Sequence, residues 1–234
     1  KLLEQEINRR KQLLRSFYSR YEGLNVEGWL DWLVLAADSF IVYRRSCDSS
    51  SVIAGYHWFE DWGRDSLISL PGLTLVTGRF DKAREILLTF THYCRKGMVP
   101  NRFPDKDGEN PVYNTVDATL WYFNAVLQFL KYTGDFEFVK GNLWSRMEEI
   151  IEWHVKGTEY GIAVDKDGLL AHGPQLTWMD AVVGKKAVTP RCGKAVEIQA
   201  LWYNALKTME LLAKRFEEYE KAKMYGEMAE KARA

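Results

Sequence analysis

Two stretches of this sequence repeat each other: Val116-Asp-Ala-Thr-Leu-Trp-Tyr-Phe-Asn-Ala125 and Val196-Glu-Ile-Gln-Ala-Leu-Trp-Tyr-Asn-Ala205. Each has an acid at its second position, Asp117 or Glu197, and an Asn-Ala pair that begins seven residues after the acid. Seven residues are two helical turns, so the acid and the asparagine share one face of a helix. The two stretches start 80 residues apart, which is about the length of two helices and a long loop. The repeat therefore indicates related helices in a repeating helical array.

Helical periodicity continues through most of the chain and predicts an all-α fold. The expected helices cover residues 2–20, 26–44, 65–77, 79–96, 115–133, 135–156, 194–213 and 216–234. The connections before the helices at 65, 115 and 194 are long, whereas the turns after them are short. Gly78 and Gly134 suit left-handed helix caps in two of those turns. This alternation predicts helical hairpins with every long loop on one rim.

Strands are expected only as short hairpins in the long connections, most clearly at 161–172. That hairpin turns on Asp165-Lys-Asp-Gly168. This stretch and Asp105-Lys-Asp-Gly108 resemble the start of a calcium loop, but the first lacks the later glutamate, and we predict a turn at both. The four histidines are isolated, and the chain has no nucleotide-binding glycine motif, so no metal and no cofactor is predicted.

Composition excludes other classes of partner. The chain has 234 residues, of which 32 are Lys or Arg and 32 are Asp or Glu, so no overall field attracts nucleic acid or an anionic membrane. No apolar run approaches ~18 residues and no signal peptide opens the chain, so a cytoplasmic protein with three reduced cysteines is expected. The chain starts at Lys1 and stops inside a helical pattern, from which we expect a fragment of a longer protein.

Polar and aromatic residues gather where the long connections meet the helices. Trp58 and the stretch Asp61-Trp-Gly-Arg-Asp65 offer flat rings for sugar faces and, in Arg64 and Asp65, donors and acceptors for hydroxyls. The acids also have a simpler interpretation as partners of a helix dipole. That interpretation leaves Arg64 and the flanking rings unexplained.

Three further groups have the same ambiguity. Asp117 and Glu197 open helices, so each is either a capping acid or a functional carboxylate, and Glu197 follows Arg191. Trp178 and Asp180 stand in the middle of the longest connection, where no helix cap accounts for them. Asp180 either forms a simple turn or serves as a general acid beside an indole, as glycoside cleavage requires.

Four motifs resemble, in sequence and in order, the amylo-α-1,6-glucosidase domain of glycogen debranching enzymes, a relative of the glucoamylases. They are Ala54-Gly-Tyr-His-Trp-Phe-Glu-Asp-Trp-Gly-Arg-Asp-Ser66, Asn114-Thr-Val-Asp-Ala-Thr-Leu-Trp121, Leu176-Thr-Trp-Met-Asp180 and Thr189-Pro-Arg-Cys-Gly-Lys-Ala-Val-Glu197. The resemblance implies an (α/α)6 toroid, present here as seven or eight of twelve helices. It also implies inverting hydrolysis of α-1,6-linked glucose at the branch points of glycogen or a similar glucan. Residues 1–24 are then a leading helix or linker, and 25–234 the N-terminal part of the catalytic domain.

Carried over by position, the resemblance makes Asp180 the general acid. It also implies that glucose is held by Trp58, Asp61, Arg64, Asp65, Asp117, Trp178, Arg191 and Glu197. The family's general base is a glutamate in a later segment, and inversion needs this second carboxylate. We therefore expect this chain alone to be inactive. Alternatives are another inverting toroid glycosidase, of glucoamylase or trehalase type, and a non-catalytic glucan-binding module. A purely helical scaffold explains the loop aromatics least well.

Overall fold

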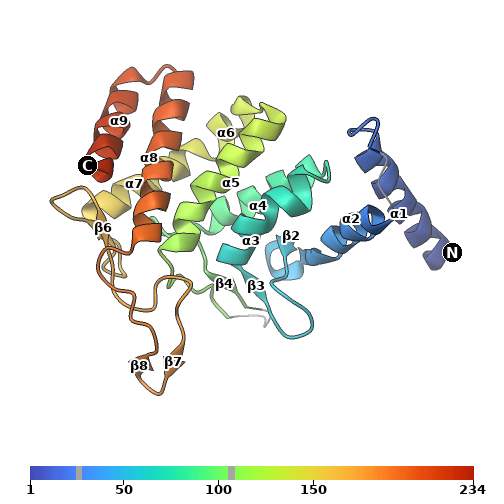
Figure 1. Ribbon diagram of the computed structural model, residues 1–234, viewed down its shortest axis with the longest axis horizontal. Helices are drawn as coiled ribbons and strands as arrows, with labels where there is room; N and C mark the ends of the chain where they lie inside the picture. The colour runs from blue at the N-terminus through green and yellow to red at the C-terminus, as the bar shows by residue number, and fades with distance from the viewer. Residues whose placement is uncertain (25–27, 105–108) are drawn as a thin grey trace.

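The computed structural model of the chain describes residues 1–24, 28–104 and 109–234, and most of these residues are helical (Figure 1). Within these ranges there are nine α-helices: α1 (Leu2–Tyr18), α2 (Trp29–Phe40), α3 (Gly63–Leu70), α4 (Phe80–Tyr93), α5 (Asp117–Thr133), α6 (Phe136–Asn142), α7 (Trp144–Lys156), α8 (Val196–Arg215) and α9 (Tyr219–Arg233). The predicted all-α class is confirmed as a mostly helical fold.

Small antiparallel hairpins occupy the connections. In the described ranges they pair β1 (Ile41–Arg44) with β2 (Ser49–Val52), β3 (Asp61–Trp62) with β4 (Arg102–Phe103), β5 (Ala163–Val164) with β6 (Leu170–Ala171), and β7 (Val182–Val183) with β8 (Lys186–Ala187). A short 3-10 turn, η1 (Arg45–Cys47), separates β1 from β2, and a π-helical turn, η2 (Pro71–Leu75), follows α3.

Three helices form the central layer of the molecule. Helix α3 packs against α5, and α5 packs against α8. All three begin on the side where β3, β4 and β6 to β8 lie (Figure 1). At the opposite ends of α5 and α8, short turns lead to α6 and α9, and α9 returns along α8. This is the arrangement that the alternation of long and short connections predicts.

The short turns owe their geometry to glycine. Gly78 and Gly134 have φ angles of 75° and 64°, in the left-handed region that residues with a Cβ rarely adopt. The N–H of Gly134 donates to the carbonyl of Leu130 at 2.8 Å and closes the end of α5. The carboxylate of Asp135 then accepts the N–H of Phe138 at 3.1 Å and caps the start of α6. Both predicted left-handed glycines are confirmed.

The core lies where α5 is enclosed by its neighbours. Its aromatic side chains Tyr122, Phe123 and Phe129 are fully buried, as is Trp202 of α8. A helix that buries residues on more than one face belongs in a central layer. Burial of each such ring contributes about 1.5–3 kcal/mol relative to exposure. This core fixes the starts of α5 and α8 relative to each other.

Two helix predictions were wrong in extent. The helix expected over 26–44 is α2 followed by the β1–β2 hairpin, and residues 25–27 lie outside the described ranges. Ile41, Val42 and Tyr43 are β-branched or aromatic and pair in register with Val52, Ser51 and Ser50. The helix expected over 135–156 is divided into α6 and α7, next to Gly141, whose missing side chain weakens helix propensity.

The helix expected over 65–77 changes character partway. After α3 the backbone widens into η2, whose first residue is Pro71. Proline has no N–H for the helical hydrogen bond and its ring crowds the preceding turn, which favours this local departure from α geometry.

The hairpin predicted at 161–172 is confirmed as β5–β6, with a turn at Asp165–Gly168. The side chain of Lys194 lies 2.7 Å from a carboxylate oxygen of Asp165 and 2.6 Å from one of Asp167. These aspartates thus tie the hairpin to the segment before α8. The similar turn predicted at 105–108 lies outside the described residues.

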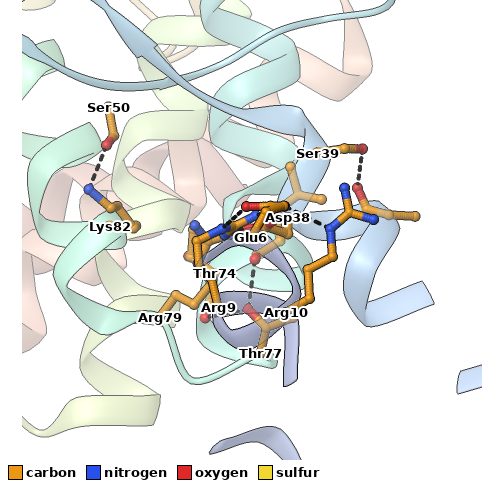
Figure 2. Close-up of polar contacts among 12 residues, drawn as sticks. Glu6, Arg9, Arg10, Asp38, Ser39, Ser50, Thr74, Thr77, Arg79 and Lys82 are labelled. Atoms are coloured by element: carbon orange, nitrogen blue, oxygen red, sulfur yellow. Dashed lines mark hydrogen bonds and ion pairs between the residues drawn. The ribbon is translucent and has the colours of Figure 1, made fainter. Parts of the chain in front are cut away.

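Helix α1 is attached to the rest of the molecule through Asp38 of α2. One carboxylate oxygen of Asp38 lies 2.6 Å from Arg9, and the other lies 2.8 Å from Arg79, which precedes α4. Figure 2 shows this cluster, in which Glu6 also meets Arg9. The hydroxyl of Tyr18 donates to Asp31 at 2.6 Å. The division of the chain at residues 24 and 25 remains a prediction.

Candidate functional site

An ion pair joins the starts of two central helices. Arg64, in the first turn of α3, meets Asp117, the first residue of α5. The Nε and Nη2 atoms of Arg64 donate to the two carboxylate oxygens of Asp117 at 2.6 and 2.9 Å. Such two-point pairing fixes the plane of the guanidinium as well as its position. The carboxylate is almost fully buried, whereas the arginine side chain keeps some exposure.

Glycine at position 63 is required for this placement. A Cβ on Gly63 would lie 2.2 Å from the carbonyl oxygen of Pro100, far inside any permitted contact. The N–H of Gly63 donates to the carbonyl of Asn101 at 2.7 Å, and β3 pairs with β4 just beyond. The backbone around Gly63 is thereby held against the 94–116 connection, and Arg64 follows directly after this contact.

Thr115 holds the carboxylate of Asp117 in place through a hydrogen bond. Its hydroxyl is fully buried and donates to Asp117 Oδ1 at 2.6 Å, and it also accepts the N–H of Ala118 at 3.1 Å. That N–H lies 2.8 Å from the same carboxylate oxygen. Sequence reasoning missed Thr115, although a Thr two residues before a helix-opening acid is a recognisable capping pattern.

The connection that carries Trp178 and Asp180 is attached to the same helix start. The N–H of Val116 donates to the carbonyl of Leu176 at 2.8 Å, so this loop meets the chain one residue before Asp117. The indole of Trp178 is 57% exposed, and Asp180 is half-buried. The backbone carbonyl of Asp180 accepts a hydrogen bond of 3.3 Å from the side chain of Gln175. The side-chain carboxyl of Asp180 takes no part in this bond.

Arg191 and Glu197 form an ion pair at the start of α8. The segment before them is bound to the 161–172 hairpin, since His172 and Gly193 exchange backbone hydrogen bonds of 3.0 and 2.8 Å. Arg191 Nε and Glu197 Oε1 are buried and have no hydrogen-bond partner among the described residues. Polar atoms of this kind can bind the hydroxyl groups of a ligand.

Trp58, Asp61 and Asp65 occupy different surroundings. The indole of Trp58 is 78% exposed and lies free of the core. Asp65 is exposed, but crowding by neighbouring atoms removes part of its hydration and raises its pKa, an effect that the nearby Asp117 carboxylate adds to and Arg64 opposes.

The carboxylate of Asp61 belongs to a different ion pair from Arg64–Asp117. It is buried and lies 2.5 Å from the Nε atom of Arg44. The Nη1 atom of Arg44 donates to the carbonyl of Pro104 at 3.0 Å. This ion pair joins β1 to β3. It was missed from the sequence because Arg44 was expected to end a helix.

The structure brings some of the eight predicted binding residues and Asp180 together and places others apart. The structure brings Arg64 and Asp117 into contact, brings Arg191 and Glu197 into contact, and bonds the loop of Trp178 and Asp180 to the start of α5. It places Asp61 in a separate ion pair. The substrate role of each residue remains a prediction.

Metal ligation finds little support in the described ranges. Among those residues, no group of three or more His, Cys, Asp or Glu side chains could hold a metal ion. Cys47, Cys94 and Cys192 are free thiols, and burial raises the pKa of Cys94 to about 12. A buried thiol with a raised pKa is a poor nucleophile.

Comparison with known proteins identifies the family of this chain and shows its similarity to a fungal enzyme. The family model described as amylo-alpha-1,6-glucosidase matches residues 35–234. The glycogen debranching enzyme of Saccharomyces cerevisiae is 29% identical over 208 residues, an alignment that covers 64% of this chain and 13% of the yeast protein. This chain thus spans a small part of that relative's length. None of the described helices is long and apolar enough to cross a membrane. With a family match that runs from α2 to the last helix and includes all four motifs, the chain belongs to the amylo-α-1,6-glucosidase family.

Proposed function

We propose that this chain forms part of a cytoplasmic glycosidase that removes α-1,6-linked glucose from branch points of glycogen or a similar glucan, with inversion. The observation that carries the proposal is the buried Arg64–Asp117 pair, to which the loop of Trp178 and Asp180 is bonded through Val116. An oriented guanidinium, an exposed indole and a loop carboxyl at one helix start suit recognition and cleavage of a sugar.

In this mechanism Asp180 is the general acid. Its protonated carboxyl donates to the glycosidic oxygen as the bond to the terminal glucose breaks, so that the leaving chain departs as an alcohol. The inverting reaction also requires a carboxylate about 6.5–9.5 Å from the acid, which activates water on the opposite face of the sugar. We assign that role to no described residue of this chain, and we expect the chain by itself to lack turnover.

The remaining residues bind and orient glucose. Asp117 engages two donor atoms of Arg64 and leaves the third nitrogen for a sugar hydroxyl, with Asp65 as a neighbouring acceptor. Trp58 and Trp178 offer exposed indole faces for the sugar ring. Arg191 Nε and Glu197 Oε1 add a donor and an acceptor from the start of α8. Asp61 supports this arrangement through β3, where it pairs with Arg44, and its predicted contact with the sugar stays a prediction.

For the complete domain we propose an (α/α)6 toroid. Support comes from the family match and from the central helices α3, α5 and α8, which lie side by side and all begin on the side of the long connections (Figure 1). In such a toroid the inner helices are parallel, and their starts surround a single pocket.

The test is an Asp180→Asn variant of the protein that carries this domain, assayed on a dextrin with single α-1,6-linked glucose branches. We expect hydrolysis to fall by about 10²–10⁴-fold, the usual contribution of a general acid, while dextrin binding persists. Asp81→Asn, which alters an exposed aspartate of α4, is the matched control and should retain full activity. Unchanged turnover in Asp180→Asn would refute the assignment.

The choice of substrate separates the alternatives. Preferential release of glucose from linear maltooligosaccharides or from trehalose would indicate a glucoamylase- or trehalase-like enzyme instead. Dextrin binding with no turnover that depends on Asp180 would indicate a binding module.

A further inference from the structure

A second concave site lies between the ends of α4 and α7, where residues 95–98 and 110–113 meet residues 159 and 160. It has a volume of about 320 Å³, at the lower end of the range for small-ligand pockets. Its polar and aromatic walls come from two connections, and its lining includes Arg95, Lys96, Asn110, Tyr113, Glu159 and Tyr160. The proposed mechanism uses none of these residues.

The walls of this site are held in place by the fold. Arg95 and Met98 exchange backbone hydrogen bonds of 2.9 and 3.0 Å across a tight turn. At its tip Gly97 has a φ of 75°, and a Cβ there would lie 2.2 Å from the Cβ of Trp153 on α7. On the opposite wall, a hydrogen bond of 2.9 Å from the N–H of Thr158 to the carbonyl of Ile162 fixes the turn between these residues. The site is therefore preformed.

The chemistry of the lining favours a neutral, hydroxyl-rich ligand. Lys96 and Glu159 form an ion pair with each other, which reduces the attraction of the site for an anion. Arg95 and Asn110 then supply donors, while Asn110 and Glu159 supply acceptors. The ring of Tyr160 is 41% exposed, and the hydroxyl of Tyr113 is occupied by a bond of 2.8 Å to the carbonyl of Tyr93. Tyrosine rings with mixed donors and acceptors suit sugar units.

The position of the site relative to Asp117 favours a polymer. Tyr113 stands four residues before Asp117 in the same connection, so their Cα atoms are at most about 14 Å apart. A ligand of several linked sugar units can span such a distance. Binding at two places on one chain strengthens attachment without any new contact at the catalytic residues.

We propose that this site binds a glucosyl unit in an outer part of the same α-glucan whose branch occupies the candidate active site. The inference rests on the proposed function for its choice of ligand. Tyr160 provides the stacking ring, and Arg95 and Glu159 bind the hydroxyls at its edge.

The experiment is an NMR titration of the chain with maltopentaose, in which backbone amide signals report each site separately. Signals of 95–98 and 158–161 should shift on titration. Tyr160→Ala should weaken this response at least about tenfold, whereas Tyr160→Phe, which keeps the ring, should retain it. Tyr132→Ala is the matched control, since Tyr132 of α5 is 45% exposed and outside the site. Thermal melting of each variant verifies folding.

A titration in which Tyr160→Ala binds as well as Tyr132→Ala would overturn the inference. So would shifts confined to the surroundings of Arg64 and Trp178, a result that leaves the proposed function standing. If only the signals of 95–98 and 158–161 respond and Trp178→Ala has no effect, the second site is supported and the proposed glucose pocket is not. A response to inorganic phosphate but not to maltopentaose would identify an anion site and refute the inference.

Discussion

The buried histidine of α7 makes a sharp prediction about stability in mild acid. His154 is 0% exposed, and its ring stacks on Trp202 with a centroid distance of 6.0 Å and an interplanar angle of 20°. Its Nδ1 atom lies 2.8 Å from the carbonyl of Ile150, and its Nε2 atom has no hydrogen-bond partner among the described residues. Burial lowers the pKa of His154 to about 4, against a smaller opposing effect of the bond to Ile150.

The direction of the effect follows from proton binding. Above pH 6.5 the imidazole of His154 is neutral in both the folded and the unfolded chain, so it costs no stability. As the pH falls from 6.5 toward 4, the unfolded chain binds a proton that the folded chain excludes. The gap of about 2.5 pH units, at about 1.36 kcal/mol per unit, corresponds to a loss of about 3 kcal/mol over this window. Below pH 4 the folded chain also binds the proton, so the loss of stability caused by His154 grows no further.

The assay is urea denaturation at several pH values between 7.5 and 4.5. We compare the native chain with His154→Phe, which keeps an aromatic ring against Trp202 but cannot titrate. Between pH 7 and pH 5 the unfolding free energy of the native chain should fall by about 2 kcal/mol more than that of His154→Phe. His92→Phe, at an exposed position of α4, should follow the native chain. A native chain whose stability changes with pH in parallel with His154→Phe would refute the reasoning.

Two further variants test the local geometry by urea denaturation. Gly63→Ala forces a Cβ against the Pro100 carbonyl and should lower the unfolding free energy by about 1–3 kcal/mol or more. Gly72→Ala is the control, since Gly72 has open space around it, and should change the unfolding free energy by less than about 1 kcal/mol. Equal effects of the two substitutions would contradict the close approach of Gly63 to Pro100. Asp135→Ala removes the cap of α6 and an ion pair of 2.7 Å with Arg84, and should cost about 1 kcal/mol. A loss below about 0.3 kcal/mol would show that the cap contributes little.

The sequence predicts the helical layer well because its signal is local. The Asp117 and Glu197 repeats mark helices that do lie side by side, and the glycines at 78 and 134 end their turns as expected. Errors arise where tertiary pairing decides the outcome. Residues 41–44 continue an apolar helical pattern, yet they pair with 49–52 because β-branched and aromatic side chains gain more from the hairpin.

The candidate site shows the same division. Its residue types and their order are visible in four short motifs, but their partners are not. The sequence presents Arg64 as a donor to ligand hydroxyls and gives no sign of its partner, which in the structure is Asp117, 53 residues later. Asp61 looks like a helix-capping or substrate-binding acid, whereas Arg44 engages it. Contacts between segments far apart in the sequence produce no periodic pattern of residues, so the sequence alone does not predict them.

Backbone hydrogen bonds join segments of the connections that are far apart in the sequence: Gly63 to Asn101, Val116 to Leu176, and His172 to Gly193. None of these bonds can form until the helices that flank them have docked, because each joins segments separated by a complete helix or hairpin. Amide protons at these points should therefore gain protection from hydrogen exchange only late in refolding, after those of α5 and α8. In the native state, opening of the loops should release them first, while the helices beneath stay closed.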